Sequence, residues 1–199
     1  MERRKWCANS LLTVLMLTTA CQPLHEGDLL FHVVAQDNHI TAVTPGMIDH
    51  VAIYAGGDSV IEAIPHQGVV TTPLHHLLTR EEGYYLLGRL EKANHKQSLT
   101  NACQYLGLPY DSLYLPTDEA IYCSELVQLS FVDRNGHRLL NPVPMSFHDS
   151  TGSITDYWQQ FYAARGMDVP EGQPGTNPSE LYNRKAVVHL RKGKAIKSR

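Results

Sequence analysis

A cysteine in the second half of the chain has the sequence context of a nucleophile. Cys123 lies in the segment 122–129, Tyr-Cys-Ser-Glu-Leu-Val-Gln-Leu, whose residue types favour a helix. In the first turn of a helix, backbone N–H groups and the positive end of the helix dipole favour a thiolate. A thiolate paired with an imidazolium is a nucleophile, and the same N–H groups can hold an oxyanion. Glu125 adds a negative charge nearby, so we expect its side chain to point elsewhere.

The histidine that the sequence places beside a carboxylate is His50. Residues 50–54 and 59–64 read as two strands of a hairpin with a glycine turn between them. If the loop is 55–57, His50 lies directly opposite Glu62; a register shifted by two makes the pair diagonal and still within reach. A carboxylate beside an imidazole fixes its orientation and stabilises its charged form. Such a pair is also common as a simple polar contact, so the pattern needs Cys123 to suggest chemistry.

The N-terminus has the layout of an export signal. Basic residues precede the apolar run 11–17, and small residues lead to Cys21. The run is shorter than the roughly 20 residues that span a bilayer. Cys21 directly after Ala20 resembles a bacterial lipobox, although Thr18 stands where leucine is usual. Residues 1–20 are therefore predicted to be a signal peptide and Cys21 a lipidated residue that holds the protein at a membrane of the bacterial cell envelope, facing the periplasm; plain secretion is the alternative.

Composition and charge narrow the class of protein. The 199 residues are 43% hydrophobic and 19% charged, an ordinary globular composition for one domain, which we place at 22–190. The formal net charge is −3, and without residues 1–20, which hold three basic residues and one acidic residue, it is −5. A mildly acidic domain argues against nucleic acid as a partner. The basic tail 191–199 is expected to be a solvated end, with contact to anionic lipid or cell wall as the alternative.

The elements that must position these residues alternate between strands and helices. Cys103 is expected to be a small core residue of its helix, because free cysteines are usually buried. Strands are predicted over 27–34, 50–54, 59–64, 69–70, 84–90 and 186–190; helices over 72–79, with Thr72-Pro73 as its start, 92–106, 122–132 and around 154–161; and a Gly/Pro-rich loop over 166–180.

Metal, serine and nucleotide sites lack the required spacing. His75 and His76 are adjacent, so on a helix they point about 100° apart and make poor co-ligands. The sequence has no HExxH, no GxSxG and no glycine-rich phosphate loop. We therefore predict neither a metal nor a cofactor.

Four segments in order resemble the circularly permuted, papain-like branch of the NlpC cysteine peptidases, and within it the YiiX/YebB-like group. The segments are 27–31, 48–54, 60–63 and 122–127, and the likeness extends to 107–111 and 171–178. In ordinary papain-like enzymes the cysteine precedes the histidine, whereas in this branch, as here, the order is reversed. The resemblance implies an α+β permuted papain-like (NlpC-type) fold, with an antiparallel sheet or partial barrel packed against helices that include the nucleophile helix.

The same resemblance implies roles for individual residues. Cys123 is expected to be the nucleophile, His50 the general base and acid, and Glu62 the residue that orients the imidazole. Tyr122 matches a tyrosine found beside the nucleophile and, with Ser124, is a candidate for support of the oxyanion. The implied activity is that of a cysteine hydrolase that cleaves an amide through a thioester acyl-enzyme.

Peptidoglycan peptides are the substrate class that the resemblance suggests first. The alternative is an amidase, esterase or acyltransferase that acts on lipid-like acyl groups, for which the segments 114–116 and 142–145 could line an apolar pocket or simply pack. The alternative of another class is a lipoprotein that uses the fold only for binding. No oligomeric state is predicted.

Overall fold

The computed structural model describes most of the chain. It covers residues 23–34, 47–80, 82–117, 119–149 and 151–190, and the backbone of 196–197. The predicted signal peptide and the lipidation of Cys21 lie outside the described residues, as does most of the basic tail.

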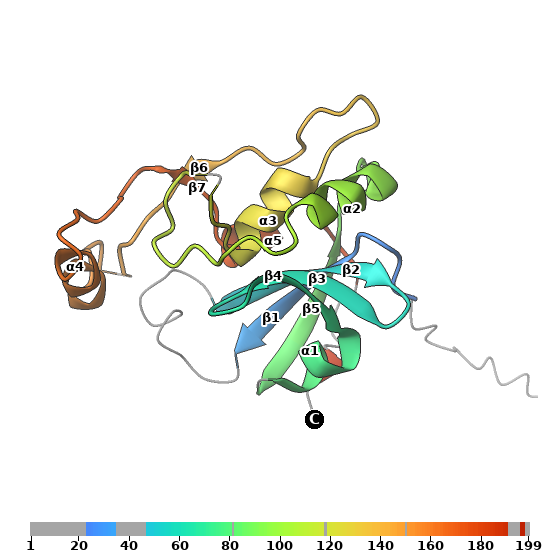
Figure 1. Ribbon diagram of the computed structural model, residues 1–199, viewed down its shortest axis with the longest axis horizontal. Helices are drawn as coiled ribbons and strands as arrows, with labels where there is room; N and C mark the ends of the chain where they lie inside the picture. The colour runs from blue at the N-terminus through green and yellow to red at the C-terminus, as the bar shows by residue number, and fades with distance from the viewer. Residues whose placement is uncertain are drawn as a thin grey trace, which may run out of the picture.

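An antiparallel sheet forms the centre of the fold (Figure 1). Its strands are β1 (Leu29–Val34), β2 (Ile48–Gly56), β3 (Ser59–Ile64), β4 (Gly68–Pro73), β5 (Gly83–Arg89), β8 (Val188–His189) and β9 (Ile196–Lys197). The order is β4-β3-β2-β1-β5-β8, and β9 also pairs with β5. A separate pair consists of β6 (Val143–Pro144) and β7 (Pro174–Gly175). The sheet does not close into a barrel, so the predicted α+β fold with an antiparallel sheet is confirmed in its open form.

Helices cover both faces of this sheet. They are α1 (Leu74–Arg80), α2 (His95–Gln104), α3 (Cys123–Ser130), α4 (Asp156–Ala163) and α5 (Pro178–Tyr182). In Figure 1, α2 and α3 lie on one side of the sheet, α1 lies on the other, and α4 lies at the far end of the molecule near β6 and β7. None of the helices in the described part of the chain has the length and apolar character needed to cross a membrane.

Alternation along β2 divides the core into two clusters. Val51 and Ile53 belong to the cluster that contains α3, and Ala52 belongs to the cluster that contains Leu77 of α1. The face that carries Ala52 is thus a second core, because α1 covers it and Ala52 is completely buried.

The helix α3 lies at the centre of the larger cluster. All eight of its residues are buried, including Leu126 and Val127 with no exposed surface. Because the helix begins at Cys123, the packing that buries the rest of α3 also fixes where the sulfur lies.

Three local predictions are wrong. Thr72-Pro73 ends β4 instead of starting a helix, and the predicted loop 166–180 contains β7 and the start of α5. Cys103 is exposed and not a core residue, because α2 buries the side on which Ser98 and Ala102 lie. Its side chain points about 100° around the helix from that of Ala102.

The turn between β3 and β4 packs tightly on the loop that follows α2. Val69 N donates to the carbonyl oxygen of Leu108 at 2.9 Å, and Gly107 N donates to Val69 O at 2.9 Å. Gly68 has a φ of +75°, and a Cβ there would overlap the Leu108 carbonyl oxygen. Glycine is therefore required at position 68 by both the backbone angle and the contact.

Gly68→Ala should lower the free energy of unfolding by about 2–5 kcal/mol, the sum of left-handed strain and overpacking. Gly136→Ala is the matched control, because Gly136 has a φ of +83° but no atom within 4 Å of the added methyl. The control should cost only the strain, about 1–2 kcal/mol. Urea unfolding of both variants measures the difference, and equal losses would contradict the packing argument.

Candidate active site

The hairpin that carries His50 and Glu62 has a tighter turn than predicted. Tyr54 lies opposite Val60, so the pairing is shifted by two residues from the register that a loop of 55–57 would give. Two adjacent glycines with φ angles of 98° and 59° permit the shorter turn. The directly opposed arrangement is therefore wrong, and the continued register makes His50 and Glu62 a diagonal pair.

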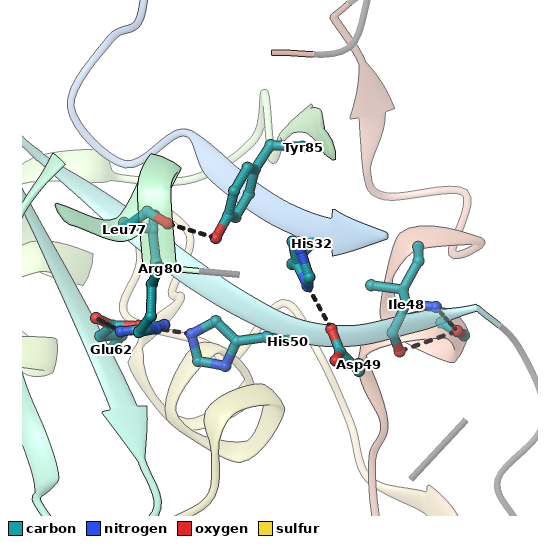
Figure 2. Close-up of polar contacts among 9 residues, drawn as sticks. His32, Ile48, Asp49, His50, Glu62, Leu77, Arg80 and Tyr85 are labelled. Carbon is teal, nitrogen blue, oxygen red and sulfur yellow. Dashed lines mark hydrogen bonds and ion pairs between the residues drawn. The ribbon is translucent and has the colours of Figure 1, made fainter. Parts of the chain in front are cut away.

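The diagonal pair is hydrogen-bonded. His50 Nε2 lies 2.6 Å from Glu62 Oε2, and the carboxylate side chain has no exposed surface (Figure 2). The pairing of β2 with β3 ends at Ile53 and Ile61, so His50 lies where the two strands separate. Its ring can therefore contact a carboxylate on one side and another element on the other.

Arg80, the last residue of α1, completes the carboxylate's surroundings. Its Nη1 donates to Glu62 Oε1 at 2.9 Å and its Nη2 donates to Oε2 at 2.8 Å. Burial alone would raise the pKa of Glu62, but hydrogen bonds from His50, Arg80 and Thr72 and the charge of His50 lower that pKa well below its ordinary value. Glu62 is therefore ionised throughout the physiological pH range. The sequence analysis missed Arg80, whose only signal is a basic residue in the last turn of a helix.

The His50 ring is also hydrogen-bonded to Cys123. With Nε2 bonded to Glu62, Nδ1 is the nitrogen left for the sulfur. Burial alone would lower the pKa of His50, but hydrogen bonds to Cys123 and Glu62 and their negative charges raise it to about 10. The imidazole is therefore protonated at neutral pH, as an ion pair with a thiolate requires.

The start of α3 also supplies hydrogen-bond donors. Its N-cap residue, Tyr122, is extended and makes no side-chain capping bond, so the N–H groups of the first turn are left to the site. Cys123 is 5% exposed, yet it lies in the wall of a pocket. This buried cysteine is thus accessible from one side.

Aromatic side chains form much of the pocket wall. The lining residues are Ile48, Asp49, Tyr110, Tyr114, Tyr122, Cys123, Ser124, Met145, Ser146, Phe147, Trp158, Thr176, Asn177 and Pro178. Of the segments considered for an apolar pocket, Tyr114 and Met145 line it. Burial raises the pKa of Tyr114 to about 12, and the charge of Cys123 adds to the effect. Tyr110, which the sequence analysis did not single out, has its pKa raised for the same two reasons.

The residues that flank Cys123 differ in the hydrogen bonds that their side chains make. The Tyr122 hydroxyl accepts a hydrogen bond from Thr176 N at 3.0 Å and donates to the Met145 sulfur at 3.8 Å. Ser124 is completely buried, and its Oγ has no hydrogen-bond partner within the described part of the chain. Glu125 is buried in the first turn, close enough for its charge to add to the effect of burial in raising the pKa of Tyr122. An oxyanion role for Tyr122 and Ser124 stays a prediction.

The adjacent histidines of α1 are not part of this arrangement. His75 and His76 have ring centroids 4.2 Å apart, and His75 pairs with Asp58 at 3.0 Å on the exposed surface. Across the described ranges, no group of three or more His, Cys, Asp or Glu side chains is placed to hold a metal ion.

Comparison with known proteins identifies the family. A family model described as permuted papain-like amidase enzyme, YaeF/YiiX, C92 family, matches residues 23–190. The chain therefore belongs to this family and is a cysteine peptidase/amidase-type hydrolase. A solved structure titled metalloprotein YiiX from Escherichia coli O157:H7 is 21% identical, has a TM-score of 0.65, and aligns over 84% of this chain and 96% of its own. That likeness shows a shared fold. No curated protein matches the chain.

Glu62→Gln should lower the pKa of His50 from about 10, because the substitution removes a negative charge and weakens the hydrogen bond that raise it. Loss of the carboxylate that orients the histidine should also lower kcat/KM by about 100-fold or more. NMR titration of the His50 ring and steady-state kinetics measure the two effects. Unchanged titration in a folded variant would exclude the orienting role.

Arg80→Ala should reduce kcat/KM by about 10-fold, because Glu62 keeps its charge but loses two hydrogen bonds that hold it. Arg165→Ala is the control, since Arg165 lies on the exposed surface against the Phe161 ring at 3.7 Å. Equal kinetics for the two variants would show that Arg80 does not act on the site.

Proposed function

We propose that this permuted papain-like amidase cleaves an amide bond through a thioester acyl-enzyme on Cys123. The observation that carries the proposal is the continuous series from the sulfur through His50 and Glu62 to Arg80, with the sulfur in the wall of a pocket. Each member has a partner of opposite charge, so the series favours the ionised nucleophile and the protonated imidazole together.

Acylation begins with attack of the Cys123 thiolate on the amide carbonyl carbon. The C–S bond forms and the carbonyl π electrons move to oxygen, which becomes an oxyanion. When the oxyanion collapses, the C–N bond breaks and His50 Nδ1 gives its proton to the departing nitrogen. The products of this step are a free amine and a thioester on Cys123.

Deacylation uses the same histidine as a base. The now neutral His50 accepts a proton from a water molecule as the water oxygen attacks the thioester carbonyl. Collapse of the second oxyanion breaks the C–S bond, releases a carboxylic acid and restores the thiolate beside the imidazolium. Glu62 stabilises the imidazolium in both halves of the cycle.

We place the oxyanion at the start of α3. The N–H groups of the first turn point toward this position, and the dipole of the helix stabilises negative charge there. Ser124, whose buried Oγ lacks a hydrogen-bond partner in the residues described, supplies a further candidate donor next to the pocket.

We propose cell-wall peptides as the first substrate class, because the family resemblance suggests them. The pocket supports a second candidate, an amide or ester with a lipid-like acyl group. Its walls include Tyr114, Phe147 and Trp158, and large aromatic surfaces favour apolar groups over charged ones.

We propose that the protein works at the cell envelope, held to a membrane through a lipid on Cys21. The support is the signal layout of residues 1–21 alone. Cys21→Ala should move the protein from the membrane fraction to the soluble exported fraction. Unchanged fractionation would contradict the lipid anchor.

Cys123→Ala should abolish hydrolysis, with a loss of at least about 1,000-fold in kcat/KM, because no thioester can form. An electrophilic probe at pH 6 should label Cys123, although it is 5% exposed, in preference to the exposed Cys103. Mass spectrometry of the labelled peptides locates the adduct, and Cys103→Ser is the control for activity. Full hydrolytic activity in Cys123→Ala would exclude Cys123 as the nucleophile, and labelling of Cys103 alone would favour a module that only binds.

Hydrolysis of a soluble peptidoglycan fragment and of an acyl-lipid, measured side by side, should separate the two substrate classes. If the aromatic wall binds the acyl group, Phe147→Ala should raise the KM for the acyl-lipid by about 10-fold or more and leave that for the peptide within about threefold. Turnover of the peptide alone would exclude the lipid-like candidate.

A further inference from the structure

One residue of β2 has no counterpart in β1. His32 lies opposite His50, and the next residue of β1, Val33, lies opposite Ile48. Asp49 is therefore the extra residue of a β-bulge, immediately before the histidine of the site. A bulge bends its strand and increases the local twist, and bulges next to active sites redirect side chains.

A buried hydrogen bond holds this bulge from the neighbouring strand. Asp49 Oδ1 lies 2.7 Å from His32 Nδ1, and the two side chains are 7% and 2% exposed. The His32 ring packs on the Tyr85 ring, with centroids 5.0 Å apart. Gly83 leaves room for it, because a Cβ at that position would lie 2.6 Å from His32 Nε2. The His32 ring, which belongs to β1, therefore has a fixed position against β5.

The bulge and the site are both fastened to α1. The Tyr85 hydroxyl donates to the carbonyl oxygen of Leu77 at 2.8 Å, and Arg80 of the same helix holds Glu62. Figure 2 shows the two polar series side by side, with His50 and Asp49 next to each other on β2. One series runs from Arg80 through Glu62 to the ring of His50. The other runs from Leu77 through Tyr85 and His32 to Asp49, the residue before His50.

The backbone on the far side of the bulge is fixed as well. Ile48 N donates to Ser179 Oγ at 3.2 Å, and the same hydroxyl donates to Ile48 O at 3.3 Å. The segment that leads into His50 is thus held by β1 on one side and by α5 on the other. Between these two attachments, Asp49 is the residue whose side chain binds His32 of β1.

We infer that Asp49 is a positioning residue, whose hydrogen bond to buried His32 holds β2 in the shape that turns the catalytic histidine toward the sulfur. This role rests on the proposed function, since it assigns the chemistry to His50 and Cys123. It adds two positioning residues, Asp49 and His32, to that function.

The test compares variants that separate charge from position. Asp49→Ala removes the carboxylate, and His32→Phe keeps that carboxylate but removes its partner. Asp49→Asn removes the charge and keeps an oxygen that can accept the bond from His32. Asp58→Ala is the matched control, because Asp58 pairs with His75 at 3.0 Å where both side chains are more than half exposed. Thermal unfolding shows which variants are folded, and NMR titration of the His50 ring is the main measurement.

Asp49→Ala and His32→Phe should each lower the titration midpoint of His50 by about one pH unit or more, because a turned ring loses the contacts that raise its pKa to about 10. In the same variants kcat should fall about 10- to 100-fold, with KM within about threefold. Asp49→Asn should recover most of what Asp49→Ala loses in both measurements, and Asp58→Ala should stay close to the parent protein.

Three outcomes would overturn the inference. An unchanged His50 titration in folded Asp49→Ala or His32→Phe would show that the bulge does not aim the ring. A shift in Asp49→Asn as large as in Asp49→Ala would assign the effect to charge. A rise in KM alone would make Asp49, which lines the pocket, a substrate contact. Because the titration needs no turnover, it stays decisive even if Cys123→Ala retains activity and the proposed function fails.

Discussion

The buried carboxylate of Glu62 is the group on which the rest of the site depends. A carboxylate with no exposed surface is costly unless cations and hydrogen-bond donors surround it. Here a histidine from β2 and an arginine from α1 approach the same two oxygens, so three elements meet at one charge. The removal of any one partner leaves buried charge uncompensated. The helix α1 on one face of the sheet is thereby linked to α3 on the other through a single imidazole ring.

The sequence indicated that Cys123, His50 and Glu62 lie together, because each has a local signature. Cys123 lies at the start of an apolar helix, and alternation in a hairpin brings His50 near Glu62 whichever of two registers holds. Arg80 could not be predicted in the same way, because its ion pair with Glu62 depends on where α1 packs across the sheet. The bulge at Asp49 shows in the sequence only as a break in alternation, because Ile48 and Val51, three residues apart, pack on the same core cluster.

The sequence-based errors have a common physical origin. Residues such as Thr72-Pro73 and the Gly/Pro-rich stretch 166–180 have strong local preferences, but pairing with neighbouring strands and packing of short helices decided their structure. The exposed position of Cys103 follows from which side of α2 faces the core. Local signals thus indicate the residues that meet in the site more reliably than the boundaries of the elements around them.

The pocket lies between two separately packed clusters of side chains. Cys123 belongs to the main core, whereas Phe147 and Trp158 belong to a distinct aromatic cluster with Tyr162 around α4. The reactive groups and the far wall of the pocket therefore draw their stability from different contacts. Mutations can accumulate in that wall without weakening the ion pair on the opposite side of the pocket. Substrate preference can therefore change during evolution while the residues of the ion pair stay the same.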